Sequence, residues 1–135
     1  DEIQAGLLRI KLDHLDDISR EKQQLASYYN VHINNKLIQK PVVKEFVSSV
    51  WHQYVVRCKN RDKLMAYLEE NKIHTIIHYP IPPHLAEAYQ GLGYKRGSFP
   101  VAEQYANEVL SLPLYIGMTK SEQDYVIDKM NRFNV

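Results

Sequence analysis

Apolar residues recur three or four positions apart through residues 2–30, a spacing that predicts one long helix. The apolar positions are Ile3, Leu7, Leu8, Leu12, Leu15, Ile18, Leu25 and Tyr29. At about 1.5 Å per residue this helix would be roughly 42 Å long, whereas a compact domain of this chain length is about 36 Å across. Its first half is therefore expected to pack on another domain or a partner. A kinked or two-part helix is the alternative.

Two stretches rich in β-branched and aromatic residues predict strands at 50–58 and 73–79. In the first, one face is formed by Val50, His52, Tyr54, Val56 and Cys58. A histidine with mostly apolar neighbours is more simply a core residue than a functional one, so His52 is expected in the core. Residues 112–115 are also expected to be extended, and Pro113 limits them to an edge or irregular strand.

Shorter helical patterns follow at 61–70, 83–90, 100–110 and from Thr119 onward. Asn71 suits the left-handed position that ends the first of them, and Gly91 can close the second. Thr119-Lys120-Ser121-Glu122 is a capping-box sequence. The side chains expected to face the core are Leu64, Met65, Leu68, Ala102, Tyr105, Ala106, Val109, Tyr125, Val126, Met130 and Phe133. The order of elements predicts an α+β fold (an α/β sandwich), in which helices cover a small antiparallel or mixed sheet.

Composition narrows the possible functions only a little. The 135 residues fit one domain, and a net charge of +1 gives no overall field that would favour nucleic acid or an acidic membrane. No apolar run approaches the roughly 20 residues that span a bilayer, and the first residues do not form a signal peptide. The single Cys58 excludes an internal disulfide. A soluble, cytoplasmic protein is expected.

The densest chemistry lies in residues 74–84, which hold three histidines, a tyrosine and three prolines. On a strand, His74 and His78 would stand about 13 Å apart, whereas zinc ligands lie ~2.0–2.3 Å from the ion, so a metal site is disfavoured. Neither a nucleophile motif nor a glycine-rich phosphate loop accompanies them, and we assign no catalytic residue. What remains is a rigid rim that presents His78 and Tyr79, or else a structural turn with two surface aromatics.

Five blocks of sequence, in order along the chain, carry a resemblance to a known family. They are Asp1-Glu2-Ile3-Gln4-Ala5, Ser49-Val50-Trp51-His52-Gln53-Tyr54-Val55-Val56-Arg57, His78-Tyr79-Pro80-Ile81-Pro82-Pro83-His84, Phe99-Pro100-Val101-Ala102-Glu103 and Leu110-Ser111-Leu112-Pro113-Leu114-Tyr115. Together they resemble the C-terminal third of sugar aminotransferases of the DegT type. These are pyridoxal-phosphate enzymes of fold type I, the fold of aspartate aminotransferase.

The resemblance implies that residues 1–135 form the small C-terminal domain, with 1–30 as the interdomain helix and 50–135 as the α/β body. It implies a homodimer that moves an amino group from L-glutamate to a keto-deoxyhexose linked to dTDP. A 3-keto-6-deoxyhexose is favoured, and a 4-keto sugar is possible. The large cofactor domain, with its Schiff-base lysine, would lie upstream of Asp1. The chain is therefore expected to be a fragment that alone neither binds pyridoxal phosphate nor catalyses transfer.

The same resemblance implies a substrate-binding role for three residues of the proline-rich stretch. His78 and Tyr79 would contact the hexose or its nucleotide at the mouth of the active site, and His84 is a weaker candidate. A histidine there could hydrogen-bond a hydroxyl or phosphate oxygen, and a tyrosine could stack on a sugar ring. The rival interpretation is a binding or dimerisation module without chemistry.

Overall fold

The computed structural model describes residues 1–135 and is built around a two-stranded antiparallel sheet. Strand β1 (Tyr54–Arg57) pairs with strand β2 (Val109–Leu112), with Tyr54 opposite Leu112. One isolated bridge extends each edge of the sheet; the pairs are Gln39–Arg57 and Ile76–Ser111. The sheet is thus the small antiparallel one that the α+β prediction calls for.

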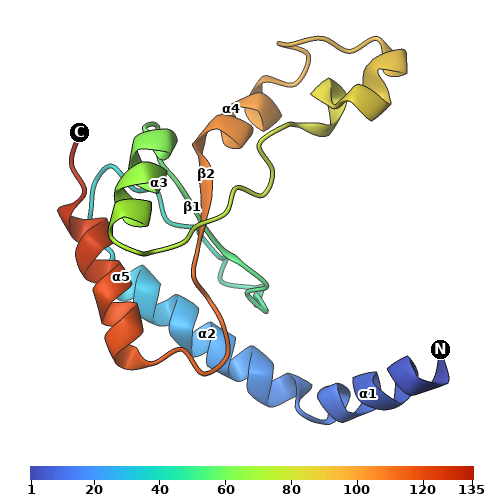
Figure 1. Cartoon of the computed structure of the whole chain (residues 1–135), viewed down its shortest axis with the longest axis vertical. Helices are drawn as coiled ribbons and strands as arrows, with labels where there is room; N and C mark the ends of the chain where they lie inside the picture. Colours follow the sequence, from blue (N-terminus) through green and yellow to red (C-terminus); the bar gives the residue numbers. More distant parts are fainter.

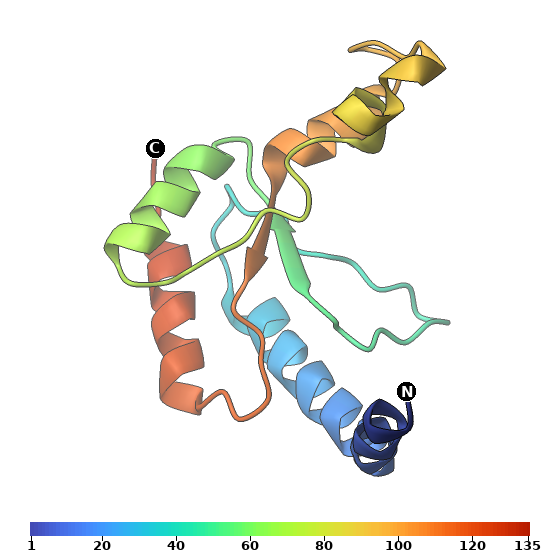
Figure 2. The ribbon, with the colours of Figure 1, turned by 45° about the vertical axis from the view of Figure 1, so that its right-hand side comes forward.

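Three helices cover one face of this sheet (Figure 2): α2 (Leu15–His32), α3 (Arg61–Glu70) and α5 (Lys120–Arg132). Because side chains alternate along a strand, β1 and β2 each send every second residue into the layer beneath the helices. The largest side chains that are completely buried there are Tyr29, Tyr54, Ile33, Leu64, Leu68, Leu110, Met130 and Val56. The predicted α+β class is therefore confirmed, with one hydrophobic core between two layers.

The prediction of one unbroken helix over 2–30 is wrong, and the two-part alternative describes the structure. Helix α1 (Glu2–Asp13) ends at His14, where φ is −107° and ψ is 5°, and α2 begins at the next residue. Asp13 and His14 both have modest helix propensity, and no residue of α1 is buried, so nothing in this chain holds the two helices on one axis. Helix α1 extends beyond the rest of the molecule and leaves its apolar residues exposed (Figure 1).

The first strand is shorter than the predicted 50–58. Trp51 has a φ of +49°, in the left-handed region, so the chain is not extended before β1. His52 and Val50 consequently lie outside the sheet and are exposed, and the prediction of a core His52 is wrong. Within the strand the alternation holds, because Tyr54 and Val56 are buried as expected.

The second predicted strand, 73–79, pairs with the sheet only at Ile76. Its partner is Ser111, and an antiparallel ladder would next pair His74 with Pro113. Proline has no backbone N–H and cannot continue such a ladder. The ladder therefore stops on the His74 side of this bridge, and β2 itself ends just before Pro113.

The helix-end signals are confirmed at one site and displaced at another. Thr119 and Glu122 form the predicted reciprocal capping box at the start of α5. Helix α3 has the predicted bounds, but its left-handed residue is Lys72, with a φ of 62°, whereas Asn71 has a φ of −90°. Tyr125 is exposed rather than buried, and the other predicted core residues of α5 are buried.

Residues 80–108 form a lobe that projects from the sheet away from α5 (Figures 1 and 2). The predicted helix 83–90 is instead two 3-10 helices, η1 (Pro83–Leu85) and η2 (Glu87–Leu92), and the left-handed glycine that ends them is Gly93, not Gly91. Helix α4 (Pro100–Glu108) then leads directly into β2. The predicted helix 100–110 is therefore too long, because Val109 belongs to β2. Of the predicted stripe, Ala106 and Val109 are buried, whereas Ala102 and Tyr105 are exposed. Every helix of the chain is too short or too polar to cross a membrane.

Candidate functional site

The strand-like segment 74–78 brings His78 against the sheet. Ile76 exchanges backbone hydrogen bonds with Ser111, with N···O distances of 2.8 and 3.3 Å. His78 follows two residues later and shares a face with Ile76, so it lies diagonally across from Ser111. Its Nδ1 is 2.9 Å from the Ser111 hydroxyl oxygen. The ring is half-buried, and Nε2 has no partner within the chain.

Tyr79 stands beside His78 at the start of the lobe. Its side chain is 73% exposed, and its ring meets the His78 ring edge to face, with centroids 5.5 Å apart and an interplanar angle of 89°. The peptide bond between the two residues is cis. Pro80 follows directly, and Pro82 opens η1 with a φ of −61°, so the backbone after the pair has little freedom. The pair offers an imidazole nitrogen, a phenol and an open aromatic face to a ligand.

His84, the third predicted site residue, lies inside the lobe. Its side chain is only 7% exposed, and its Nε2 is 2.9 Å from the Glu103 carboxylate. The ring of Phe99 packs against it at a centroid distance of 4.9 Å. His84 thus has a partner within the chain and little surface to offer. The fold does not bring His84 together with His78 and Tyr79. Its contact with substrate stays a prediction.

The carboxylate of Glu103 ties His84 to the loop before α4, a role that the sequence did not predict. We call this set of hydrogen bonds the clasp. Besides the His84 ring, the Glu103 carboxylate accepts hydrogen bonds from the N–H groups of Gly97 (2.7 and 3.0 Å) and Phe99 (3.4 Å). The hydrogen bond from His84, followed by those from Gly97 and Phe99, lowers the pKa of the Glu103 carboxyl. An acidic residue in the first turn of a helix that begins at Pro100 was the available signal.

The clasp predicts a pH dependence of the lobe. Because the pKa of Glu103 is lower in the folded protein, the unfolded state binds more protons. The stability that this carboxylate contributes is therefore complete above its ordinary pKa of 4.5 and is lost as the pH falls through the lower folded-state pKa. We expect the Gly97 amide resonance to titrate with a midpoint below pH 4.5 in NMR spectra. Glu103→Gln should remove that inflection, and a midpoint at or above 4.5 would contradict the clasp.

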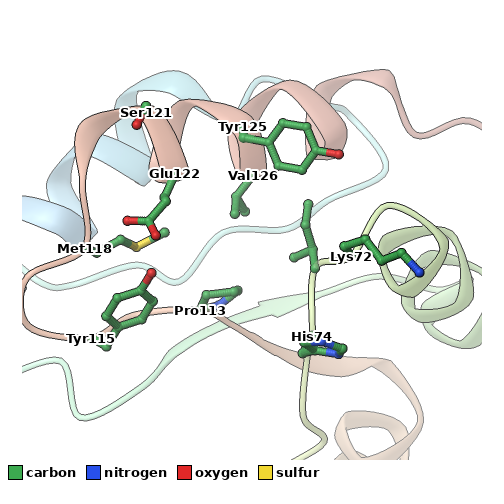
Figure 3. A pocket seen from close by; sticks show the side chains of 10 residues that line it. Lys72, His74, Pro113, Tyr115, Met118, Ser121, Glu122, Tyr125 and Val126 are labelled. Carbon is green, nitrogen blue, oxygen red and sulfur yellow. The ribbon is translucent and has the colours of Figure 1, made fainter.

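A cavity of about 490 Å³ lies elsewhere, between α5 and the chain that leaves β2 (Figure 3). Tyr115, Met118 and Tyr125 line it and make it largely apolar. Two of its polar groups are engaged in the chain: the Tyr125 hydroxyl donates to the Asn71 carbonyl, and Glu122 belongs to the capping box. The cavity is therefore mainly apolar space beside α5.

A pyridoxal-phosphate cofactor requires a lysine whose amino group is free to form an imine. Lys72 borders the cavity of Figure 3 but points away from it. The amino group of Lys40 donates to two backbone carbonyls, and that of Lys120 pairs with Asp124. No group of three His, Cys, Asp or Glu side chains is placed to hold a metal ion. None of these three lysines presents a free amino group to the cavity, so they do not fit an imine with the cofactor.

The arrangement of helices around a small antiparallel sheet matches an α+β fragment of a fold type I aminotransferase. Residues 1–131 match the model of the DegT/DnrJ/EryC1/StrS aminotransferase family. The chain belongs to this family, as its five sequence blocks predicted.

Three relatives show how much of such a protein the chain represents. It is 44% identical to dTDP-3-amino-3,6-dideoxy-alpha-D-galactopyranose transaminase of Aneurinibacillus thermoaerophilus, over 98% of this chain and 36% of that protein. It is 38% identical to dTDP-3-amino-3,4,6-trideoxy-alpha-D-glucose transaminase of Streptomyces venezuelae, over 98% of this chain and 35% of that protein. The crystal structure of S. venezuelae DesV with a ketimine intermediate superposes on this chain with a TM-score of 0.92 and 39% identity. The match covers 97% of this chain and 36% of the DesV chain. The chain thus spans about a third of the length of these relatives.

Proposed function

We propose that these residues are the sugar-facing C-terminal part of a pyridoxal-phosphate-dependent nucleotide-sugar aminotransferase. The reaction moves an amino group from L-glutamate to a keto-deoxyhexose linked to dTDP, with a 3-keto-6-deoxyhexose favoured over a 4-keto sugar. The observation that carries the proposal is the 44% identity, along nearly the whole chain, to a transaminase named for a dTDP-linked 3-amino-3,6-dideoxyhexose. The second relative is also named for a dTDP-linked 3-amino sugar.

Within this function, His78 and Tyr79 form one wall of the sugar site. The Nε2 atom of His78 is unpartnered in the chain and can hydrogen-bond a hydroxyl, carbonyl or phosphate oxygen. Tyr79 presents an exposed ring face that can lie against a sugar ring, and a phenolic hydroxyl at its rim. Pro80 and Pro82 hold the pair in place, which lowers the conformational entropy lost on binding. His84 is proposed as a weaker contributor that acts from inside the lobe.

Pyridoxal phosphate, when bound by the whole protein, supplies the electron sink for transamination. The part played by this chain is to bind and orient the sugar nucleotide. The proposal includes a homodimer in the cytoplasm. The exposed apolar residues of α1, such as Leu7 and Leu8, support burial of that helix against another part of the protein or a partner subunit.

The test is a substrate panel on the natural-length protein, with L-glutamate as donor and dTDP-linked 3-keto and 4-keto sugars as acceptors. The proposal would be overturned if none of the nucleotide sugars accepted the amino group.

The isolated 135 residues are expected neither to bind pyridoxal phosphate as an imine nor to transfer an amino group. Two lysines support this expectation: the Lys72 side chain is turned away from the cavity of Figure 3, and the Lys40 amino group donates to two backbone carbonyls. The measurement is the visible-edge absorbance of the cofactor after gel filtration, with the natural-length protein as the positive control. Stoichiometric absorbance that borohydride fixes to the isolated chain would contradict this expectation.

A further inference from the structure

We propose that Ser111 is a positioning residue that fixes the His78 imidazole so that its Nε2–H group is presented to the ligand as a hydrogen-bond donor. This inference rests on the proposed function, because it assigns the polarity of the same sugar-facing wall. It concerns a residue of the Leu110-Ser111-Leu112-Pro113 block that neither the fold nor the proposed function otherwise explains. Three observations carry it: the placement of Ser111, the partner of its hydroxyl, and the open nitrogen of His78.

Ser111 is paired on both sides within the sheet next to His78. It lies in β2 between two backbone neighbours, with Val55 of β1 on one side and Ile76 on the other. The residue is only 6% exposed. Because both edges of β2 are paired at this point, the hydroxyl is held at a fixed place relative to the backbone that carries His78. A side chain so placed can set the orientation of the imidazole two residues beyond Ile76.

The hydroxyl of Ser111 has a single hydrogen-bond partner in the structure, His78 Nδ1 at 2.9 Å. A buried hydroxyl hydrogen without an acceptor is unfavourable, and His78 Nδ1 is the one atom of the chain that is hydrogen-bonded to this hydroxyl. The serine must therefore donate to Nδ1, which requires that nitrogen to carry no proton. In a neutral imidazole the remaining hydrogen then lies on Nε2. The serine thus selects the tautomer as well as the orientation of the ring.

This polarity limits what the ligand can place against His78. An Nε2–H donor needs an acceptor, such as a carbonyl, hydroxyl or phosphate oxygen of a sugar nucleotide. A protonated amine has only donors and cannot satisfy it. Ser111 therefore makes the wall selective for an oxygen at this position, through a side chain that does not itself touch the ligand.

The test is a double-mutant cycle in the natural-length holoenzyme, with Ser111→Ala, His78→Ala and the double variant, assayed with a dTDP-linked keto sugar. Ser111→Ala should raise KM for the sugar by about 2- to 10-fold, the effect of one neutral hydrogen bond, with a smaller change in kcat. Ser111→Thr keeps the hydroxyl and should restore KM. The double variant should be no worse than His78→Ala alone, because Ser111 acts through His78. Additive losses, or no rescue by threonine, would overturn the inference.

A second measurement does not depend on any variant folding. In protein labelled with ¹³C and ¹⁵N at histidine, the His78 resonances should show the Nε2–H tautomer at neutral pH. The Nδ1–H tautomer would overturn the inference.

The kinetics of the variants distinguish the two possible failures. If His78→Ala leaves KM unchanged, the sugar-facing role of the proposed function fails. If His78→Ala raises KM but Ser111→Ala acts independently of it, only the role of Ser111 fails.

Discussion

His78→Ala is expected to raise KM for the dTDP-linked keto sugar about 10- to 100-fold in the natural-length protein, and to leave cofactor affinity unchanged. The size follows from the roughly 1.5–3 kcal/mol that a hydrogen bond to a charged ligand group contributes. Tyr79→Phe removes one hydroxyl and keeps the ring, so about a 3- to 10-fold increase in KM is expected. Steady-state kinetics with the sugar nucleotide varied, together with a titration of pyridoxal phosphate, measure both effects.

Matched controls come from the same elements. His74→Ala removes another histidine of the same segment, one that is exposed and paired with Glu69, and should leave KM unchanged. Tyr89→Phe removes the hydroxyl of an exposed tyrosine of the lobe and should also leave KM unchanged. If the His78 and Tyr79 variants behave like these controls, the pair is a structural turn and not a wall of the sugar site.

Tyr29→Ala is expected to have the largest effect on stability, with a loss of roughly 3–5 kcal/mol in the free energy of unfolding. Tyr29 has no exposed surface, its ring lies 5.0 Å from that of Tyr54, and its hydroxyl donates to the Pro113 carbonyl at 2.9 Å. Truncation therefore leaves a cavity between α2 and the sheet. A loss of this size is a large fraction of the stability of a typical domain, so the variant is expected to be partly unfolded at 25 °C.

Two further variants separate the packing of Tyr29 from its hydrogen bond. Tyr29→Phe keeps the ring and loses the hydroxyl, which donates to the Pro113 carbonyl and also contacts the Met118 sulfur, so a loss of about 1 kcal/mol is expected. Tyr89→Ala truncates an exposed tyrosine and should change stability little. Urea unfolding followed by circular dichroism gives all three values. Equal losses for Tyr29→Ala and Tyr89→Ala would show that the core is not organised around Tyr29.

The parts of the fold that depend on residues close together in the chain were predictable. The apolar spacing of α3 gave its bounds, and Thr119 and Glu122 gave the start of α5. Both signals act within one or two helical turns. The extended segment predicted at 112–115 is displaced, because β2 covers Val109–Leu112 and ends just before Pro113, which lacks a backbone donor.

The two strand misassignments have different causes, one local and one that depends on a distant partner strand. His52 has the same parity as Tyr54 and yet is exposed. The left-handed backbone at Trp51 prevents the strand from extending back to include His52. The stretch 73–79 has strand composition but gains only one bridge, because its partner strand stops at Pro113. Extended residues become a strand only where a neighbour supplies backbone hydrogen bonds.

The candidate site divides in the same way. The sequence by itself determined that His78, Tyr79 and the prolines after them form a stiff aromatic turn, because alternation and the fixed φ of proline are local properties. Only the tertiary structure decided that His78 meets Ser111, 33 positions away, and that Glu103 holds His84 inside the lobe. The physical reason is that a hydrogen bond acts over about 3 Å, and sequence spacing does not show which distant residues the fold brings within that distance.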